Sequence, residues 1–178
     1  MLPPSLQLSI GAFMTLPYRR NVGAVLFNRR GQVFLGRRSD ITAREVWQCP
    51  QGGIDGDEDP ATAVMRELRE EIGSNDALIL GEHTEWLSYD FPADLPQRER
   101  VARHRGQTQR WFALLLLAGD DAINLAAHGT PEFDRWRWAE LSELATLDVG
   151  FKRPVYQRLA VDFAHYVDQA RTMKLGAP

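Results

Sequence analysis

The sequence has little cysteine and no long apolar segment. Its single cysteine, Cys49, allows no internal disulfide, which is typical of a reducing compartment and predicts a cytoplasmic location. No apolar run approaches the ~18 residues that a membrane-spanning helix needs. The first fourteen residues also lack the basic start and continuous apolar stretch of a signal peptide. We therefore expect neither a disulfide-stapled protein nor a membrane partner.

The sequence also lacks a strong charge imbalance. A formal net charge of −3 argues against general nucleic-acid binding, and DNA is not an expected partner. The 178 residues, of which 44% are hydrophobic and 25% charged, suffice for one globular domain with a full core. Arginines cluster at 19–20, 29–30, 37–38 and 98–110, and acids at 55–71 and 120–121. An acidic site bordered by separate arginines suits a polyphosphate substrate.

The order of the expected elements predicts one mixed domain without internal repeats. We expect a flexible lead-in at 1–17, with Met14 as an alternative start, a domain at 18–170 and a tail at 171–178. Alternating apolar patterns and turn residues predict strands, and a period of 3.6 predicts helices. The expected strands are 22–27, 32–37, a short one near 47, an interrupted one at 78–90, 109–117 and 133–138. Residues 91–107 form an expected loop, 141–147 a short helix and 152–169 one long amphipathic helix. Strands around a central helix predict an α/β (α+β) sandwich.

The central helix is the best-marked element. Asp59 is an expected N-cap, and Pro60 occupies the first helical position, where its missing N–H costs nothing. Apolar residues at intervals of four form one core-facing stripe, and Gly73 predicts a left-handed C-cap. The stripe consists of Val64, Leu68 and Ile72.

The same helix carries three carboxylates at i, i+3 and i+4. Glu67, Glu70 and Glu71 therefore converge on one helix face, and such hard oxygen ligands suit Mg²⁺, Mn²⁺ or Ca²⁺. A solvated acidic face is the alternative interpretation. The glycine-rich approach at 51–53 favours a ligand site, because glycine lets backbone groups come close. Arg66, four residues before Glu70, is placed to orient that carboxylate.

These residues share the types and intervals of the Nudix box, so the chain resembles the Nudix hydrolases. The positions that carry the resemblance are Gly52, Glu58, Arg66, Glu67, Glu70, Glu71 and Gly73. Ser74 departs from the family, which usually has an aliphatic residue there. The resemblance implies cleavage of nucleoside diphosphates linked to another moiety. It also implies the Nudix fold, a mixed β-sheet sandwiched between helices.

Segments outside the box are similar to the bacterial RNA pyrophosphohydrolases and to the related dinucleoside polyphosphate hydrolases. They are residues 18–23, 47–53, 130–138 and 151–156. This resemblance implies metal ligation by Glu67, Glu70, Glu71, Glu132 and the backbone carbonyl of Gly52. Mg²⁺ is the expected cofactor, with Mn²⁺ or another divalent cation as a substitute. For Glu132, the alternative is an exposed polar loop residue.

The resemblance also implies a substrate-binding set. Arg19 and Phe151 could sandwich a purine, while Val149 and Lys152 read its edge. Stacking of this kind is worth ~1–3 kcal/mol per base. Arg38 matches an arginine that contacts phosphates, and Tyr89 matches a substrate-side aromatic. Phe151 could instead be a core residue at a helix start.

The implied activity is a metal-dependent RNA pyrophosphohydrolase. It would convert 5′-triphosphate or 5′-diphosphate RNA ends to 5′-monophosphate, release pyrophosphate or phosphate, and promote mRNA decay. Glu67 is the favoured proton acceptor and Glu70 the alternative. Asymmetric hydrolysis of diadenosine tetraphosphate and related dinucleotides is the closest alternative activity. A non-catalytic Nudix module is disfavoured because the box carboxylates are intact. We expect a monomer.

Three departures from the branch bear on substrate choice. Arg20 stands where the branch commonly has proline, and Cys49 where it has phenylalanine or methionine. The loop at 91–107 lies where substrate lids often sit. Burial at a strand end is the expected state of Cys49, rather than service as a nucleophile.

Overall fold

The computed structural model describes residues 16–93, 95 and 103–174. The expected lead-in therefore lies almost wholly outside the described residues, as do the last four residues of the expected tail. Within the described part, the first strand begins at Tyr18 and the last helix ends at Thr172, two residues beyond the expected boundary at 170. No helix in the described part is both long and apolar enough to cross a bilayer.

The described chain forms one mixed sheet of eight strands. Their order is β3-β2-β1-β7-β5, with β4 on β1, β6 on β7 and β8 on β2. β1 and β7 pair in parallel, and the other pairings are antiparallel. The strands are β1 (Tyr18–Phe27), β2 (Val33–Arg38), β3 (Trp47–Gln48), β4 (Gln51–Gly53), β5 (Ala77–Glu82), β6 (Leu87–Asp90), β7 (Gly106–Leu116) and β8 (Phe133–Ala139).

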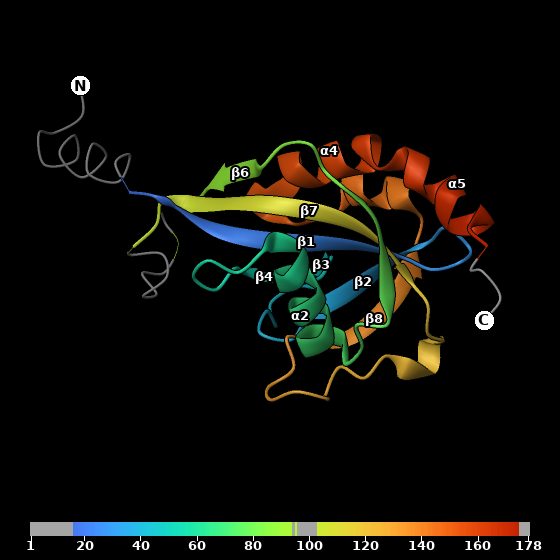
Figure 1. Cartoon of the computed structure of the whole chain (residues 1–178). Coiled ribbons are helices and arrows are strands. Elements are labelled where there is room, and N and C mark those ends of the chain that lie inside the picture. The colour runs from blue at the N-terminus through green and yellow to red at the C-terminus, as the bar shows by residue number, and fades with distance from the viewer. Residues whose placement is uncertain (1–15, 94, 96–102, 175–178) are drawn as a thin grey trace, which may run out of the picture.

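Helices cover both faces of this sheet (Figure 1). The helix α2 (Pro60–Ile72) lies on one face, and α4 (Arg153–Asp162) and α5 (Ala164–Thr172) lie on the other. The described residues also include three short 3₁₀ helices: η1 (Asp120–Ala122), η2 (Leu141–Thr146) and η3 (Gly150–Lys152). The predicted mixed sheet between helices is confirmed.

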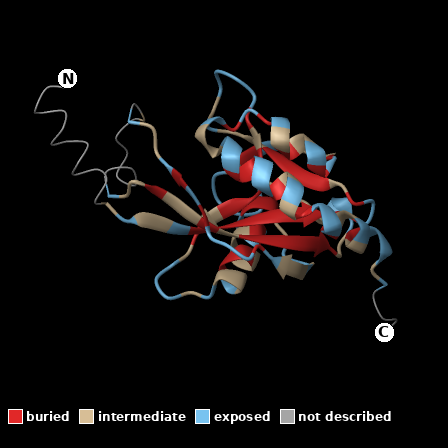
Figure 2. Cartoon of the chain, turned by 90° about the horizontal axis from the view of Figure 1, so that it is seen from above, coloured by how far each residue is buried: buried red, intermediate tan, exposed pale blue. Residues whose placement is uncertain are grey.

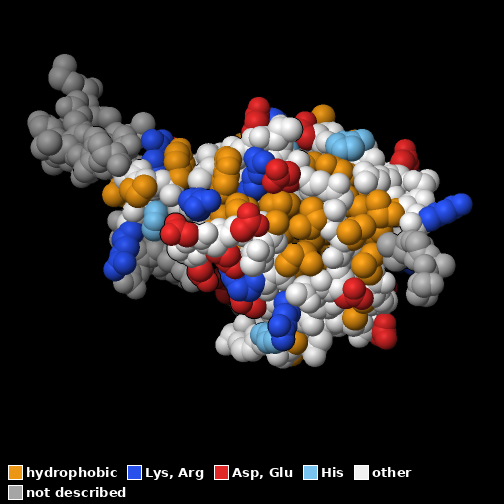
Figure 3. All heavy atoms as spheres, in the orientation of Figure 1, with side chains coloured by type: hydrophobic (Ala, Val, Ile, Leu, Met, Phe, Trp, Pro, Cys, Tyr) orange, Lys and Arg blue, Asp and Glu red, His pale blue; other side chains and the backbone are white. Residues whose placement is uncertain are grey.

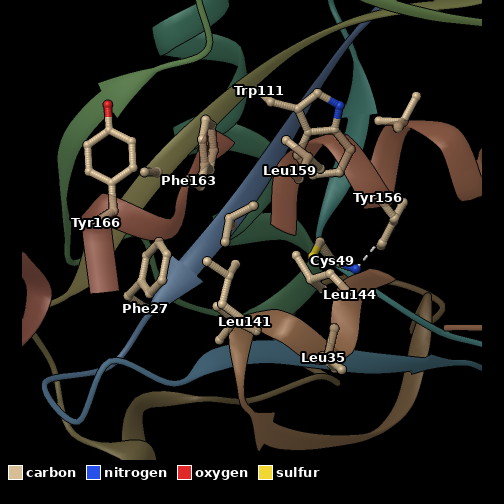
Figure 4. Close-up of a cluster of buried hydrophobic side chains, with 14 of the residues drawn as sticks. Phe27, Leu35, Cys49, Trp111, Leu141, Leu144, Tyr156, Leu159, Phe163 and Tyr166 are labelled. Carbon is tan, nitrogen blue, oxygen red and sulfur yellow. Dashed lines mark hydrogen bonds between the residues drawn. The ribbon is translucent and has the colours of Figure 1, made fainter. Parts of the chain in front are cut away.

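Alternation along the strands produces two cores, one on each face of the sheet. On β1, Val22 and Ala24 pack with Leu68 of α2, whereas Val25 packs with Leu159 of α4. The strands at the centre of the sheet are largely buried, whereas the helices carry exposed residues on their outer sides (Figure 2). Figure 4 shows the core under α4, which includes Trp111, Tyr156 and Leu159.

Local signals place α2 as predicted. The Asp59 side chain accepts hydrogen bonds from the backbone N–H groups of Ala61 and Thr62, which satisfies two of the free donors at the helix start. Gly73 ends the helix with φ 80°, a left-handed conformation that glycine adopts without a Cβ penalty. The box helix therefore has fixed ends, and the carboxylates along it have fixed positions.

The prediction of a single helix over 152–169 is wrong. The helix breaks at Phe163, where φ is −97° and ψ is 6°, and α4 and α5 are separate. Contacts with the β5–β6 connection hold the break: His83 hydrogen-bonds to Asp162 at 2.8 Å, and its ring packs 5.9 Å from that of Phe163. Because no glycine or proline marks the break, the sequence periodicity did not reveal it.

Candidate active site

The three box glutamates differ strongly in exposure. The side chain of Glu67 is 14% exposed and that of Glu70 is 52% exposed, and both line a polar cavity of about 480 Å³. Glu71 is buried beside this cavity, with 5% of its surface exposed. The cavity is also lined by Gly52, Gly53 and Glu132. The structure thus gathers the predicted metal-ligating positions around one space.

Gly52 lies in direct contact with the box helix. Gly52 in β4 pairs with Val22 in β1, so the backbone of Gly52 is fixed in the sheet. A Cβ added at Gly52 would lie 1.9 Å from the carboxylate of Glu67, far inside van der Waals contact. The absence of a side chain at Gly52 is therefore what lets Glu67 reach the strand.

Arg66 organises the box, but its main partners differ from the predicted one. Its guanidinium donates to Glu58 at 3.0 and 2.8 Å, to Glu67 at 2.8 Å and to the Gly53 carbonyl at 2.8 Å. Its distance to Glu70 is 3.5 Å, an ion pair and not a hydrogen bond. Arg66 thus orients Glu67 first, and its hydrogen bonds lower the pKa of Glu58. Sequence spacing suggested the i, i+4 partner and could not show the contact with Glu58 and the loop.

The environment of the buried carboxylates disfavours their charged form. Burial raises the pKa of Glu67, an effect that the Arg66 hydrogen bond opposes. Burial also raises the pKa of Glu71 well above its ordinary value, with further contributions from Glu132 and Glu67. Glu71 Oε2 accepts from the Gln51 backbone N–H at 3.1 Å, whereas Oε1 is buried without a hydrogen-bond partner among the described residues. A positive charge close to this cluster would relieve both effects.

Two of these acids each accept a hydrogen bond from a separate arginine. Arg38 donates to Glu132 at 2.7 Å and Arg66 to Glu67 at 2.8 Å. Within the described part of the chain, no three acidic, histidine or cysteine side chains are gathered tightly enough to hold a metal ion as they stand. The donor chemistry nevertheless fits a hard divalent cation, because it consists of carboxylates, one with an unsatisfied buried oxygen.

A second cavity, of about 450 Å³, adjoins the acidic one. Every residue predicted to bind substrate lines it: Arg19, Arg38, Tyr89, Val149, Phe151 and Lys152. Tyr89 and Phe151 pack with their ring centroids 5.4 Å apart, and Phe91 closes the aromatic group at 6.2 Å from each. These residues come from β1, β2, β6 and the approach to α4, so only the folded chain brings them together.

The two cavities share four lining residues, namely Arg19, Arg38, Gln107 and Lys152. Lys152 donates from Nζ to Gln48 Oε1 at 3.2 Å. Burial, followed by the charge of Arg38, lowers the pKa of Lys152 to about 8. Three cations thus stand at the boundary between an acidic cavity and an aromatic one.

Sequence reasoning missed several lining residues. Gln107 lines both cavities and accepts a hydrogen bond from the Tyr89 hydroxyl, and Gln48 holds Lys152. Gln48 lies in the segment 47–53 that carries the resemblance and Gln107 ends the expected loop at 91–107, but nothing in either segment singles out these side chains. Phe91 does have a signal, since it begins the loop that the sequence placed at a lid position.

Cys49 is buried, as predicted. Its backbone N–H donates to the Tyr156 hydroxyl at 3.0 Å, a contact drawn in Figure 4. Burial raises the pKa of its thiol to about 12. A thiol of this kind remains protonated at neutral pH, which excludes service as a nucleophile.

Comparison with known proteins identifies the family of this chain. The NUDIX domain model matches residues 17–159. A protein of Acidiphilium cryptum named RNA pyrophosphohydrolase is 61% identical over 153 residues, covering 85% of this chain and 93% of that protein. A protein of the same name from Gluconacetobacter diazotrophicus is 52% identical over 161 residues, covering 87% and 96%.

Among solved structures, the Ap4A hydrolase of C. elegans matches with a TM-score of 0.58. It is 18% identical and covers 84% of this chain and 98% of its own, a likeness of fold alone. The domain match and the close relatives show that this chain belongs to the Nudix hydrolase family, whose members cleave pyrophosphate bonds and generally use divalent metal cations.

Proposed function

We propose that this enzyme hydrolyses 5′-triphosphate or 5′-diphosphate ends of RNA to 5′-monophosphate, releasing pyrophosphate or phosphate, and so promotes mRNA decay. One observation carries the proposal: the substrate-binding residues inferred from separate segments line one cavity, and that cavity adjoins the acidic box. The close relatives named RNA pyrophosphohydrolase support the same activity. A monomer in the cytoplasm remains the prediction for its state and location.

The metal site in this proposal consists of the box and its neighbours. Mg²⁺, or Mn²⁺ in its place, would be held by the Gly52 carbonyl and by Glu67, Glu70, Glu71 and Glu132. A divalent cation supplies neutralisation of phosphate charge and a lowered pKa of the attacking water. The raised pKa values of Glu67 and Glu71 support this assignment.

Cationic side chains would hold the polyphosphate between the two cavities. Arg19, Arg38 and Lys152 line both spaces, and their charges complement a chain of phosphates. Glu67 is the proposed acceptor of the proton from the attacking water, with Glu70 as the alternative. Arg66 fixes the orientation of Glu67 through its 2.8 Å hydrogen bond.

The aromatic cavity would hold a base near the 5′ end. Phe151 and Tyr89 offer ring surfaces, and the guanidinium of Arg19 lines the same space. Base stacking on such groups sets affinity with little sequence preference. Val149 and Lys152, at the same wall, would contact the edge of the base.

Hydrolysis of dinucleoside polyphosphates is the competing activity. A tight adenine clamp near Tyr89 would favour it, whereas a pocket for a second RNA base would favour RNA. In the structure Tyr89 packs on Phe151 within one cavity. This is the cavity in which Arg19 and Phe151 are expected to hold an RNA base, and the close relatives named RNA pyrophosphohydrolase favour RNA.

A paired assay tests the proposal. Purified protein with Mg²⁺ receives either 5′-triphosphate RNA or diadenosine tetraphosphate, and phosphate and nucleotide products are measured. We expect higher kcat/KM on RNA and loss of activity when the divalent cation is chelated. Faster cleavage of the dinucleotide would overturn the assignment to RNA. Glu67→Gln should lower kcat by ~10³-fold, as for loss of a preorganised electrostatic group, and near-wild-type activity would refute its role.

A further inference from the structure

The end of the sheet beyond α2 carries an arrangement that the proposed chemistry does not use. α2 packs over Val22, Ala24 and Phe112, but β1 and β7 extend further (Figure 1). On this extension, the side chains that share the α2 face come from three neighbouring strands. They are Tyr18 and Arg20 of β1, Thr108 and Arg110 of β7, and Ser88 and Asp90 of β6. We call this set, together with Trp86 and Arg105, the sheet-end face.

Two arginine–aromatic pairs lie on the sheet-end face. The Arg20 guanidinium lies 5.3 Å from the ring centre of Trp86, and that of Arg105 lies 4.9 Å from the ring centre of Tyr18. Trp86 is 37% exposed, one of three exposed large hydrophobic side chains in the described residues. Figure 3 shows hydrophobic and Lys or Arg side chains interleaved at this end of the molecule.

The arginines of the sheet-end face differ in whether a carboxylate pairs with them. Arg105 pairs with Asp90 at 2.7 Å and Arg110 with Glu82 at 2.8 Å. Among the residues described, Arg20 has no carboxylate within ion-pairing distance, and its guanidinium lies over the ring of Trp86. A guanidinium held over an exposed ring, without an acidic partner, is free to bind an anion from solution.

The backbone around Trp86 is held firmly. Arg110 Nη1 donates to the Thr84 carbonyl at 3.1 Å, and Arg158 pairs with Glu85 at 3.1 Å. The next anchor is His83, which hydrogen-bonds to Asp162 at 2.8 Å. Because these contacts fix the connection between β5 and β6, Trp86 is presented as a preorganised surface.

The sheet-end face and the active site share the strand β1. Arg19 lines both cavities, and Arg20 is its neighbour on the opposite face of the strand. The Arg20 carbonyl accepts from the Ile54 backbone N–H at 3.2 Å, directly after the box glycines. The box loop and the sheet-end face therefore meet at Arg20.

We propose that the sheet-end face binds the single-stranded body of the RNA, a few nucleotides downstream of the 5′ end, by stacking bases on Trp86 and Tyr18 and pairing a phosphate with Arg20. Aromatic rings beside arginines on an open sheet are the usual means of holding single strands. Ser88 and Thr108 lie between the pairs and share a hydrogen bond of 2.9 Å, so their hydroxyls can also meet a sugar or phosphate. The inference rests on the proposed function, since it extends the same substrate.

The test compares two substrates that share their first two nucleotides. One is a 5′-triphosphate dinucleotide and the other an unstructured 5′-triphosphate RNA of about 12 nucleotides, long enough for a typical single-strand site. We expect the wild-type kcat/KM ratio, long over short, to be about tenfold, equivalent to ~1.4 kcal/mol. Trp86→Ala and Arg20→Gln should reduce this ratio to near one, and Trp86→Tyr should retain part of it.

Leu78→Ala is the matched control, because Leu78 is 39% exposed and lines neither cavity. It should keep the wild-type ratio. A wild-type ratio of one, or a ratio that Trp86→Ala leaves unchanged, would overturn the sheet-end face as an RNA site. Thermal unfolding of each variant distinguishes lost binding from lost folding.

A binding measurement distinguishes failure of this inference from failure of the proposed function. A 5′-monophosphate RNA of the same length, labelled at its 3′ end, is titrated with wild-type and Trp86→Ala protein. If the wild type hydrolyses neither triphosphate substrate, the proposed function fails. Binding that Trp86→Ala weakens about tenfold would still support the RNA surface, whereas equal binding by both proteins would refute it.

Discussion

Replacing Gly52 with alanine should lower kcat strongly and the free energy of unfolding only slightly. The φ of Gly52 is not in the left-handed region, which contains only Gly31, Gly56, Gly73, Gly129 and Gly150 among the described residues. The backbone therefore tolerates a side chain, and the obstacle is steric. The new Cβ would fall 1.9 Å from the Glu67 carboxylate, and the pairing with Val22 prevents the strand from withdrawing. Glu67 must rotate away.

The magnitudes follow from what Glu67 loses. Its displacement breaks the 2.8 Å hydrogen bond from Arg66, whereas the bonds of Arg66 to Glu58 and the Gly53 carbonyl remain. One such bond contributes about 1 kcal/mol to the free energy of unfolding, or about 2–4 °C in Tm for a chain of this size. The expected loss in kcat is ~10³-fold, because a preorganised group leaves its place.

The assay is kcat on 5′-triphosphate RNA at saturating Mg²⁺, with Tm measured on the same preparations. Gly56→Ala is the control: no atom lies within 4 Å of its added Cβ, but its φ is +52°. That variant should lose ~1–2 kcal/mol through backbone strain and keep its kcat. A Gly52→Ala enzyme whose kcat stays within about threefold of wild type, far short of the ~10³-fold loss, would refute the argued role of the Gly52–Glu67 contact.

Three further predictions address the base pocket, the boundary cations and the helix break. Phe151→Ala should raise KM for RNA about 5- to 150-fold, the equivalent of ~1–3 kcal/mol of stacking, with kcat nearly constant; a fall in kcat at unchanged KM would contradict a binding role. Because the pKa of Lys152 is lowered to about 8, its charge is present below that pH and is lost above it. The kcat/KM, which reports the free enzyme, should therefore decline above pH 8, and Lys152→Arg should remove that decline. Asp162→Asn should lower the free energy of unfolding by about 1 kcal/mol at pH 7 by weakening the hydrogen bonds with His83 and Arg158. Those bonds lower the pKa of Asp162, so its contribution is present above the unfolded-state pKa of ~3.9 and disappears as the pH falls through the folded-state value. Urea unfolding should give the wild-type and Asp162→Asn proteins different free energies of unfolding at pH 7 and similar ones at low pH. An equal difference at the two pH values would contradict the proposed role of the Asp162 carboxylate.

Local sequence signals were sufficient for the box helix. Asp59, Pro60 and Gly73 act within a few residues of their own positions, and the caps they form are those that the sequence predicts. Val64, Leu68 and Ile72 are buried as the helical period requires. Local periodicity failed at Phe163, because the break there depends on His83, which is 80 residues away in the sequence.

The set of residues that lines the aromatic cavity was predictable only through resemblance to a family. Nothing in the local pattern around Tyr89 or Phe151 indicates that their rings meet at 5.4 Å, since the pairing of β6 with β7 and the position of η3 bring them together. The partners of Arg66 likewise could not all be predicted from local sequence. Helical spacing correctly identified Glu70 as a neighbour, but the loop that returns Glu58 and Gly53 to the guanidinium is not periodic.

The geometry of β1 explains how one short segment can serve two surfaces. Successive side chains on a strand point to opposite faces, so Arg19 enters the catalytic cavities while Arg20 reaches Trp86. The strand can hold both positions because its register with β7 is continuous from Tyr18 to Phe27. A slip of one residue would exchange the faces of the two arginines and move the buried side chains that follow them into the opposite core. The burial of β1 on both faces from Asn21 onward therefore also fixes which arginine lines the cavities and which lies over Trp86.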